Sequence, residues 1–137
     1  MKRRALKWLV IGFVWLGLVA CATLPVKPIT KAELKDLKGE WIGFRYGSSG
    51  GWSYTAETDI KILNDLPILA SVTFYGTAVG TVTYSSTGEL KDGKLFLQGP
   101  YNDCWFELTL HSDGNKMRLE GNYQWRQSRG TVFLEKK

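Results

Sequence analysis

From residue 39 onward, the apolar and polar residues of this chain alternate with a period of two. Between residues 52 and 63, one set of alternate positions is mostly apolar or aromatic, and the other set includes Glu57 and Asp59. Successive side chains of a β-strand point to opposite sides, so this pattern indicates strands with one buried and one solvent-exposed face. A chain of this kind must fold into sheets that bury one face.

Turn signals divide the alternating region into strands. The clearest is the Asp113-Gly114 pair, which lies between two regularly alternating segments and predicts a hairpin. Residues 87–93 are likewise predicted to form a connecting turn. The predicted strands are residues 40–46, 52–63, 68–75, 79–86, 94–98, 104–111, 116–125 and 130–135.

Short, regular connections favour antiparallel pairing of consecutive strands. We therefore predict an all-β fold, a roughly eight-stranded antiparallel up-and-down barrel, because closure leaves no exposed edge strand. A β-sandwich is the alternative. A short helical turn is expected before the first strand, where Thr30 and Glu33 have capping-box spacing and Gly39 supplies a stop. Leu34 and Leu37 share one face of that turn, which would lie across an end of the barrel.

The chain begins with basic residues and a 13-residue apolar run from Trp8 to Ala20, whose end forms Leu18-Val19-Ala20-Cys21 with the next residue. This run is shorter than the ~20 residues of a membrane-spanning helix and matches a signal peptide better. The tetrapeptide resembles the lipobox of bacterial lipoproteins. The resemblance implies cleavage before Cys21 and its acylation, with lipid holding the protein in a membrane. A retained anchor and a cleaved signal without lipid are the alternatives.

The predicted organisation is a lipoprotein signal peptide at 1–20, a lipid-anchored tether with the short helical turn at 21–38, and a β-barrel domain at 39–137. Ala22, rather than Asp, follows Cys21. By resemblance to lipoproteins of double-membraned bacteria, this favours the outer membrane, on its periplasmic side or at the surface. In a single-membraned bacterium the anchor would lie in the plasma membrane.

Charge argues against a nucleic-acid partner. The chain has 18 basic and 13 acidic side chains, and four of the basic ones lie within residues 1–20. Without the predicted signal peptide, basic and acidic side chains nearly balance and no basic cluster remains.

Gly39-Glu40-Trp41 opens the first predicted strand directly after the helical turn. This sequence is similar to the Gly-x-Trp start of lipocalins and related calycin barrels. The resemblance implies that Trp41 plugs the closed end of the barrel, and that a basic side chain near the last strand, Arg126 or Arg129, covers it. The chain lacks the Thr-Asp-x-x-Tyr motif of that family.

Residues with catalytic chemistry are few. Cys104 and His111 are seven residues apart on one predicted strand, an odd spacing that places them on opposite faces and rules out a Cys–His dyad. We expect Cys104 to be buried and His111 to be solvated. Glu57 and Asp59 belong to a solvated outer face. We expect no enzyme activity, no metal site and no cofactor.

Binding is the function class that the pattern favours. An eight-stranded barrel is either filled by its own side chains or holds one small ligand, and the sequence leaves both open. In the first hypothesis, the barrel binds a small apolar or amphipathic molecule, with Trp52, Tyr54, Tyr123 and Trp125 lining the pocket. In the alternative, a filled barrel acts as an envelope scaffold and binds a protein or cell-wall glycan through exterior aromatic residues such as Trp105.

Overall fold

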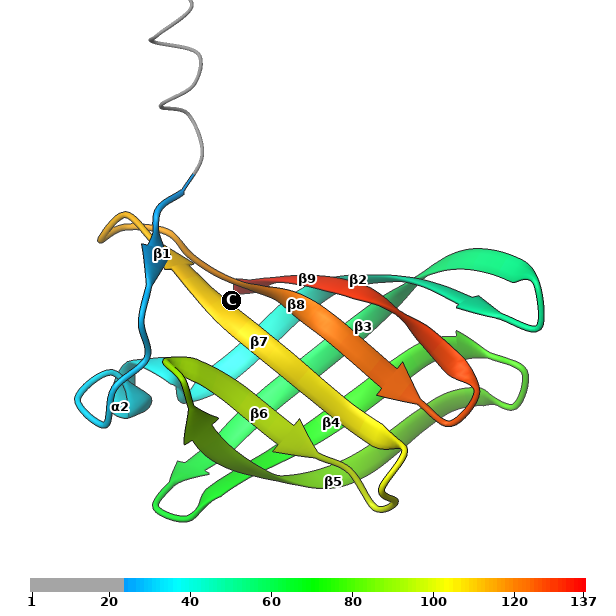
Figure 1. Cartoon of the computed structure of the whole chain (residues 1–137), viewed down its shortest axis with the longest axis horizontal. Helices are drawn as coiled ribbons and strands as arrows, with labels where there is room; N and C mark the ends of the chain where they lie inside the picture. Colours follow the sequence, from blue (N-terminus) through cyan, green and yellow to red (C-terminus); the bar gives the residue numbers. More distant parts are fainter. Residues whose placement is uncertain (1–23) are drawn as a thin grey trace, which may run out of the picture.

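A computed structural model describes residues 24–137, and within them the chain forms a closed antiparallel barrel (Figure 1). Its strands are β2 (Gly39–Ser49), β3 (Trp52–Asp65), β4 (Ile68–Thr77), β5 (Gly80–Lys91), β6 (Lys94–Gln98), β7 (Cys104–Ser112), β8 (Met117–Trp125) and β9 (Ser128–Lys136). Each pairs with its neighbours in chain order, and β9 pairs with β2 to close the barrel. The predicted all-β barrel is confirmed, because a sandwich would require two separate sheets.

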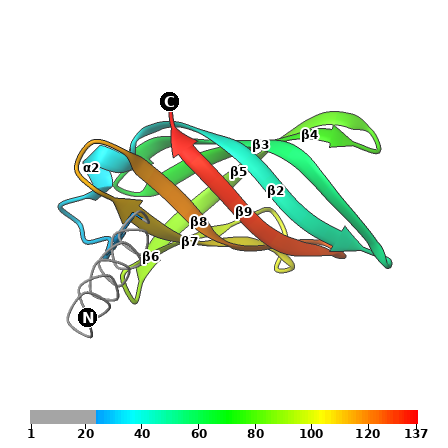
Figure 2. The ribbon, with the colours of Figure 1, turned by 90° about the horizontal axis from the view of Figure 1, so that it is seen from above.

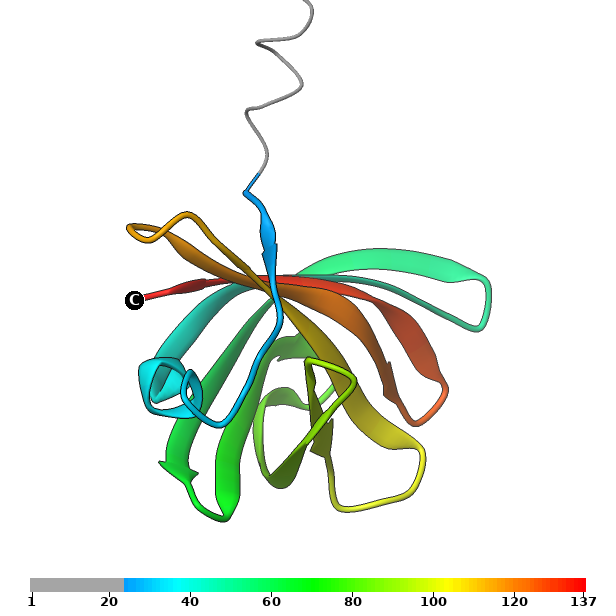
Figure 3. The ribbon, with the colours of Figure 1, turned by 60° about the vertical axis from the view of Figure 1, so that its left-hand side comes forward.

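The two-residue alternation separates the barrel interior from its surface. On β7, Cys104, Phe106, Leu108 and Leu110 are fully buried, and the residues between them are partly exposed. Figure 3 shows the curved wall that brings such inward faces together. Aliphatic side chains from six of the barrel strands, all but β2 and β5, fill the interior at one end: Ile60, Ile62, Ile68, Val72, Leu95, Leu108, Leu110, Leu119 and Leu134.

The short helix α2 (Leu34–Leu37) lies at this filled end (Figure 2). Leu34 and Leu37 are buried, and the backbone N–H of Thr30 donates to Glu33 Oε2 at 2.9 Å, which is one half of a capping box. The helix ends before Gly39, whose φ of 122° is a conformation that glycine adopts without strain.

Residues 24–29, which belong to the predicted tether, contact the barrel. The short strand β1 (Val26–Lys27) pairs with Leu110 and His111 of β7, and the Ile29 N–H donates to Gly93 O at 2.8 Å. The five-residue strand β6 pairs with β7 only between Trp105 and Leu108. β1 therefore covers the part of the β7 edge that β6 leaves exposed.

The prediction of a turn over residues 87–93 is wrong for most of its length. β5 continues to Lys91, and residues 87–91 pair with β6. Gly88 lies within this strand because there is no room for a side chain: a Cβ there would be 2.5 Å from Ile68 Cγ2. A glycine that signals a turn in the sequence here permits close packing inside a strand.

At the end away from α2, the wall of the barrel opens between two strands. The ladder between β3 and β4 stops at the pair Thr58–Phe74, whereas the β2–β3 ribbon continues to the pair Ser49–Trp52. The tip of the β2–β3 hairpin therefore projects past the barrel wall, as its position at the far right of Figure 1 shows.

Candidate functional site: the recess at the open end of the barrel

The two ends of the barrel differ, and Trp41 closes the one beside α2. Its side chain is fully buried, and its indole Nε1–H donates to the Leu37 carbonyl oxygen at 2.8 Å. Lys136 Nζ lies 6.0 Å from the centroid of the indole ring and donates to the Asp36 carbonyl oxygen. Trp41 therefore lies where a plug is expected, and Lys136 is the basic side chain next to it.

The expectation that Arg126 or Arg129 covers Trp41 is wrong. β2 and β9 run antiparallel, so Trp41 near the start of β2 pairs with Lys136 near the end of β9. Arg129 pairs with Ser48 near the opposite end of β2, and Arg126 lies in the adjacent β8–β9 turn. Both arginines therefore lie at the open end of the barrel.

The open end contains a recess of about 650 Å³. Tyr54, Tyr123 and Trp125, three of the four residues predicted to line a pocket, lie in its wall. The β4–β5 hairpin borders its mouth with Ala78 and Val79. The barrel is thus filled at one end and has a recess at the other.

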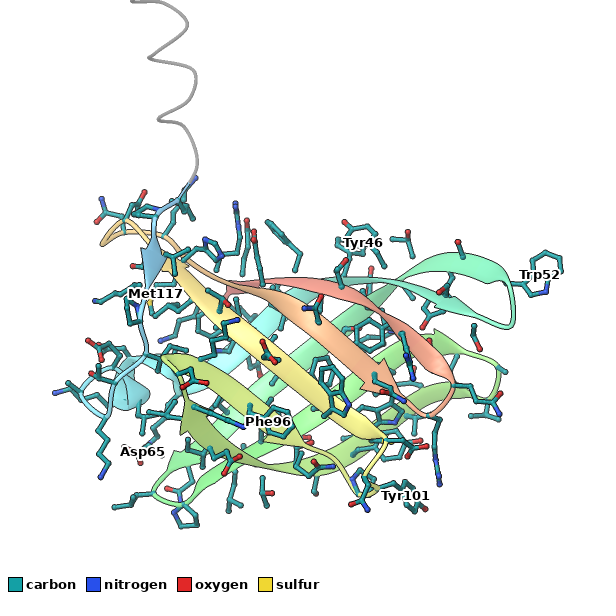
Figure 4. The ribbon with its side chains drawn as sticks, viewed as in Figure 1. Tyr46, Trp52, Asp65, Phe96, Tyr101 and Met117 are labelled. Atoms are coloured by element: carbon teal, nitrogen blue, oxygen red, sulfur yellow. The ribbon has the colours of Figure 1, made fainter. Side chains whose placement is uncertain are left out.

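Trp52, the fourth predicted lining residue, does not reach the recess. Its side chain is 80% exposed and points away from the barrel at the tip of the β2–β3 hairpin (Figure 4). The alternation places Trp52 on the inward side of β3. At this point, however, the β2–β3 ribbon has projected past the barrel wall, so the inward side no longer faces the barrel interior.

The aromatic rings of Phe74, Tyr84 and Trp125 line the recess. The ring of Trp125 lies 4.9 Å from that of Phe74, 5.1 Å from that of Tyr84 and 5.8 Å from that of Phe106, measured between centroids. These separations are typical of interacting aromatic pairs. The cluster presents a rigid apolar surface to any molecule in the recess.

Three hydroxyl groups meet beside this aromatic surface. Tyr54 Oη lies 2.7 Å from Tyr123 Oη and also contacts Ser128 Oγ. Gly47 makes room for them, because a Cβ at that position would lie 2.1 Å from Tyr123 Oη. Burial, and secondly the hydrogen bond with Tyr54, raises the pKa of the Tyr123 phenol. The Tyr123 phenol is therefore held neutral and acts as a hydrogen-bonding group.

Arg45 also lines the recess, although it is not among the residues predicted to do so. Its guanidinium donates from Nη1 to Glu57 O at 2.5 Å and Thr58 Oγ1 at 2.9 Å, and from Nη2 to Tyr75 O at 2.9 Å. Its Cζ lies 4.9 Å from the centroid of Phe74. The sequence contains a signal for this position. Arg45 is four residues after Trp41 on the same predicted strand, so the two-residue alternation places both side chains on the inward face.

Arg126 borders the recess as a rim residue. Its Cζ lies 3.6 Å from the centroid of Tyr101, and its Nη1 lies 3.7 Å from Asp103 Oδ1. Tyr101 is at the lower right of Figure 4, on the loop between β6 and β7. The charge of Arg126 is thus balanced at the surface, unlike that of Arg45.

Cys104 and His111 lie on opposite faces of β7, as the spacing predicts. Cys104 is fully buried, and burial raises the pKa of its thiol. The expectation that His111 is solvated is wrong: its Nδ1 lies 3.2 Å from Leu24 O, and its Nε2 lies 3.4 Å from Glu120 Oε2. β1 covers the imidazole because it adds to the edge of β7 at this residue.

The outer face carries the remaining candidates. Glu57 and Asp59 are on the barrel exterior, where the Tyr75 hydroxyl donates to Asp59 Oδ2 at 2.8 Å and this bond raises the pKa of Tyr75. Trp105 stacks on Phe96 with a centroid separation of 6.2 Å. Trp105 is therefore part of a half-buried pair and not an isolated surface ring.

Within residues 24–137, no cluster of three or more His, Cys, Asp or Glu side chains is arranged to hold a metal ion. The one helix in that part of the chain is too short to span a bilayer. Residues 1–20 and Cys21, to which we assign the signal peptide and the acylation, lie outside the described residues. Comparison of the chain with protein-family models, with curated proteins and with solved structures finds no match.

Proposed function

We propose that this chain is a lipid-anchored, non-catalytic protein of the cell envelope whose barrel binds a small apolar or amphipathic molecule. The observation that carries the proposal is the recess of about 650 Å³, a size within the range of small-molecule sites. The lipobox-like sequence ending at Cys21 supports the anchor, and the lipocalin-like start at Trp41 supports the binding role.

The shape of the recess favours reversible binding from one end. Trp41 and α2 close the opposite end, and the split between β3 and β4 beyond the pair Thr58–Phe74 widens the mouth. A ligand would enter past the β4–β5 hairpin and rest against Trp125 and Tyr84.

The chemistry of the lining supports binding without catalysis. Among the described residues that line the recess there is no Asp, Glu, His or Cys. The tyrosine hydroxyls and the guanidinium of Arg45 can donate hydrogen bonds, but a general base with a pKa near neutrality is not among these groups. The buried Cys104 and the outer-face His111 do not contribute to the recess.

The test is to block the recess and measure binding of an apolar fluorescent probe, N-phenyl-1-naphthylamine. Ala56 lines the recess, so the Ala56→Trp substitution would fill part of its volume. We expect saturable probe binding by the full chain and a loss of affinity of about tenfold or more in Ala56→Trp. Ser85→Trp is the matched control, because Ser85 lies on the exposed face of β5.

Unchanged probe affinity in a folded Ala56→Trp variant would show that the probe binds elsewhere. Absence of saturable binding to the wild-type chain would contradict the binding role altogether. Circular dichroism of each variant establishes that the substitutions leave the barrel intact.

A further inference from the structure

The recess contains a buried cation without an acidic partner. Arg45 is only 5% exposed, and no ion pair among residues 24–137 includes it. Burying a charge is costly unless it is paired or fully hydrogen-bonded. The carbonyl and hydroxyl oxygens around Arg45 solvate the guanidinium in part, but they do not neutralise it.

The hydrogen bonds of Arg45 leave part of its donor capacity unused. A guanidinium has five N–H bonds. Nη1 uses both of its hydrogens on Glu57 O and Thr58 Oγ1, and Nη2 uses one on Tyr75 O. Among the residues that the structure describes, no acceptor takes the Nε hydrogen or the second Nη2 hydrogen. The unused donors belong to a side chain that lines the recess.

The neighbouring hydroxyl cluster also has a donor to spare. Tyr54, Tyr123 and Ser128 carry three hydroxyl hydrogens and make two hydrogen bonds with one another. Whichever way these bonds run, one hydrogen remains for another acceptor. The cluster adjoins the cation, since Arg45 Cζ lies 5.7 Å from the ring centroid of Tyr54. Both groups with unused donors therefore line the same recess.

The depth of this polar spot indicates how a ligand would be oriented. Arg45 lies four residues before Ser49 at the end of β2, which corresponds to roughly 13 Å along a strand. The wall of the recess between this polar spot and the mouth includes Val82, Tyr84 and Val79, which are apolar or aromatic. A ligand that satisfies both regions has an acceptor group at its inner end and an apolar body toward the mouth.

We propose that the recess binds an amphipathic monoanion, with its carboxylate on the Arg45 guanidinium and the Tyr54–Tyr123–Ser128 hydroxyls. A single negative charge neutralises the single buried cation, and a planar carboxylate matches the guanidinium. This inference deepens the proposed function and rests on it, because it names the ligand class of the same recess.

The first test uses the wild-type full chain and three probes with the same alkyl chain. Decanoate, decanol and decyltrimethylammonium compete with N-phenyl-1-naphthylamine, and the displacing concentration is measured for each. We expect decanoate to displace the dye at about tenfold to a hundredfold lower concentration than decanol, with the cation weakest. Protonating decanoate at low pH removes this preference, because the neutral acid no longer pairs with Arg45.

The second test removes the cation. Arg45→Gln is expected to bind decanoate and decanol with similar affinity, whereas the control Arg129→Gln keeps the preference because Arg129 is exposed outside the recess. Arg45 also joins β3 to β4, so folding of Arg45→Gln is checked by circular dichroism. If that variant does not fold, the wild-type probe series decides the question by itself.

The outcomes separate this inference from the proposed function. Equal displacement by decanoate and decanol in the wild-type chain overturns the anionic ligand and leaves an apolar binding site in place. A preference for decanoate that persists in folded Arg45→Gln also overturns the assignment of the carboxylate to Arg45. A chain that binds neither the dye nor any of the three probes overturns the inference together with the proposed function.

Discussion

Arg45 illustrates how one inward residue changes what a barrel can hold. The carbonyls of Glu57 and Tyr75 lie one residue beyond the last pair of the β3–β4 ladder, and both accept from the guanidinium. Buried backbone carbonyls need hydrogen-bond partners. Arg45 therefore holds the two strands together where their own ladder ends, while the wall opens into the recess beyond it.

Tyr123 makes the stability of the barrel sensitive to alkaline pH. Burial raises the pKa of its phenol above the value of about 10 expected in the unfolded chain. The neutral phenol of Tyr123 therefore contributes fully to the free energy of unfolding below pH 10. This contribution falls by about 1.4 kcal/mol per pH unit as the pH rises from there through the folded-state pKa. Urea unfolding between pH 8 and pH 11 measures this loss as a fall in the free energy of unfolding.

Tyr123→Phe separates this group from the other groups that titrate at high pH. We expect a loss of about 1 kcal/mol at pH 8 from the missing hydrogen bond with Tyr54, followed by a shallower fall above pH 10. Tyr46→Phe on the exposed face of β2 is the control. An equally steep fall in wild-type and Tyr123→Phe chains would contradict the assignment.

Single residues also show the limit of pattern-based prediction. Alternation correctly puts Tyr54 and Trp52 on the same side of β3, but only Tyr54 lines the recess. Whether an inward position meets the interior depends on how far the neighbouring strand stays paired with it, and the pairing of β3 with β4 stops at Thr58. The sequence of β3 carries no information about where this pairing ends.

Among the elements, α2 has only four residues, and yet it closes one end of the barrel. Leu37 is fully buried, and its carbonyl accepts the indole N–H of Trp41. Leu37→Ala would leave a cavity beside Trp41, and we expect the free energy of unfolding to fall by about 2–5 kcal/mol. Urea denaturation checks this value.

Lys35→Ala is the matched control on the same helix, because Lys35 is exposed and its truncation is expected to change stability by less than about 0.5 kcal/mol. Dye binding by folded Leu37→Ala should equal that of the wild-type chain, since the recess is at the opposite end. Similar stability of the two variants would show that α2 does not contribute to the core.

The strands could be located from the sequence better than their ends. β6 has the predicted bounds, whereas β5 extends through residues predicted to form a turn, because β6 pairs with them. β1 was not predicted as a strand, since two residues carry too little pattern to be recognised. Its formation depends on the exposed part of the β7 edge, which exists only in the folded barrel.

For the molecule as a whole, the predicted anchor determines where the recess would be used. If Cys21 is acylated, metabolic labelling with a palmitate analogue should label the expressed chain, and membrane fractions should contain it. Cys21→Ser should abolish both the label and the membrane association, whereas Cys104→Ser should retain them because that thiol is buried inside the barrel. Equal labelling of Cys21→Ser and wild-type chains would contradict the lipobox interpretation.

The sequence by itself determined the class of fold and the face that each strand buries. Alternation is a local property, and a strand transfers it directly to the two sides of a sheet. The lipobox-like segment and the near balance of charge in the rest of the chain are also readable in one dimension.

Only the tertiary structure decided which basic side chain lies beside Trp41 and what the open end of the barrel contains. Lys136 rather than Arg129 lies beside Trp41 because of the register between β2 and β9. The recess exists because β3 and β4 part beyond Thr58, and Arg45 meets Tyr54 and Phe74 there only when β2, β3 and β4 lie side by side. Register and closure arise from contacts between distant segments, so no local pattern specifies them.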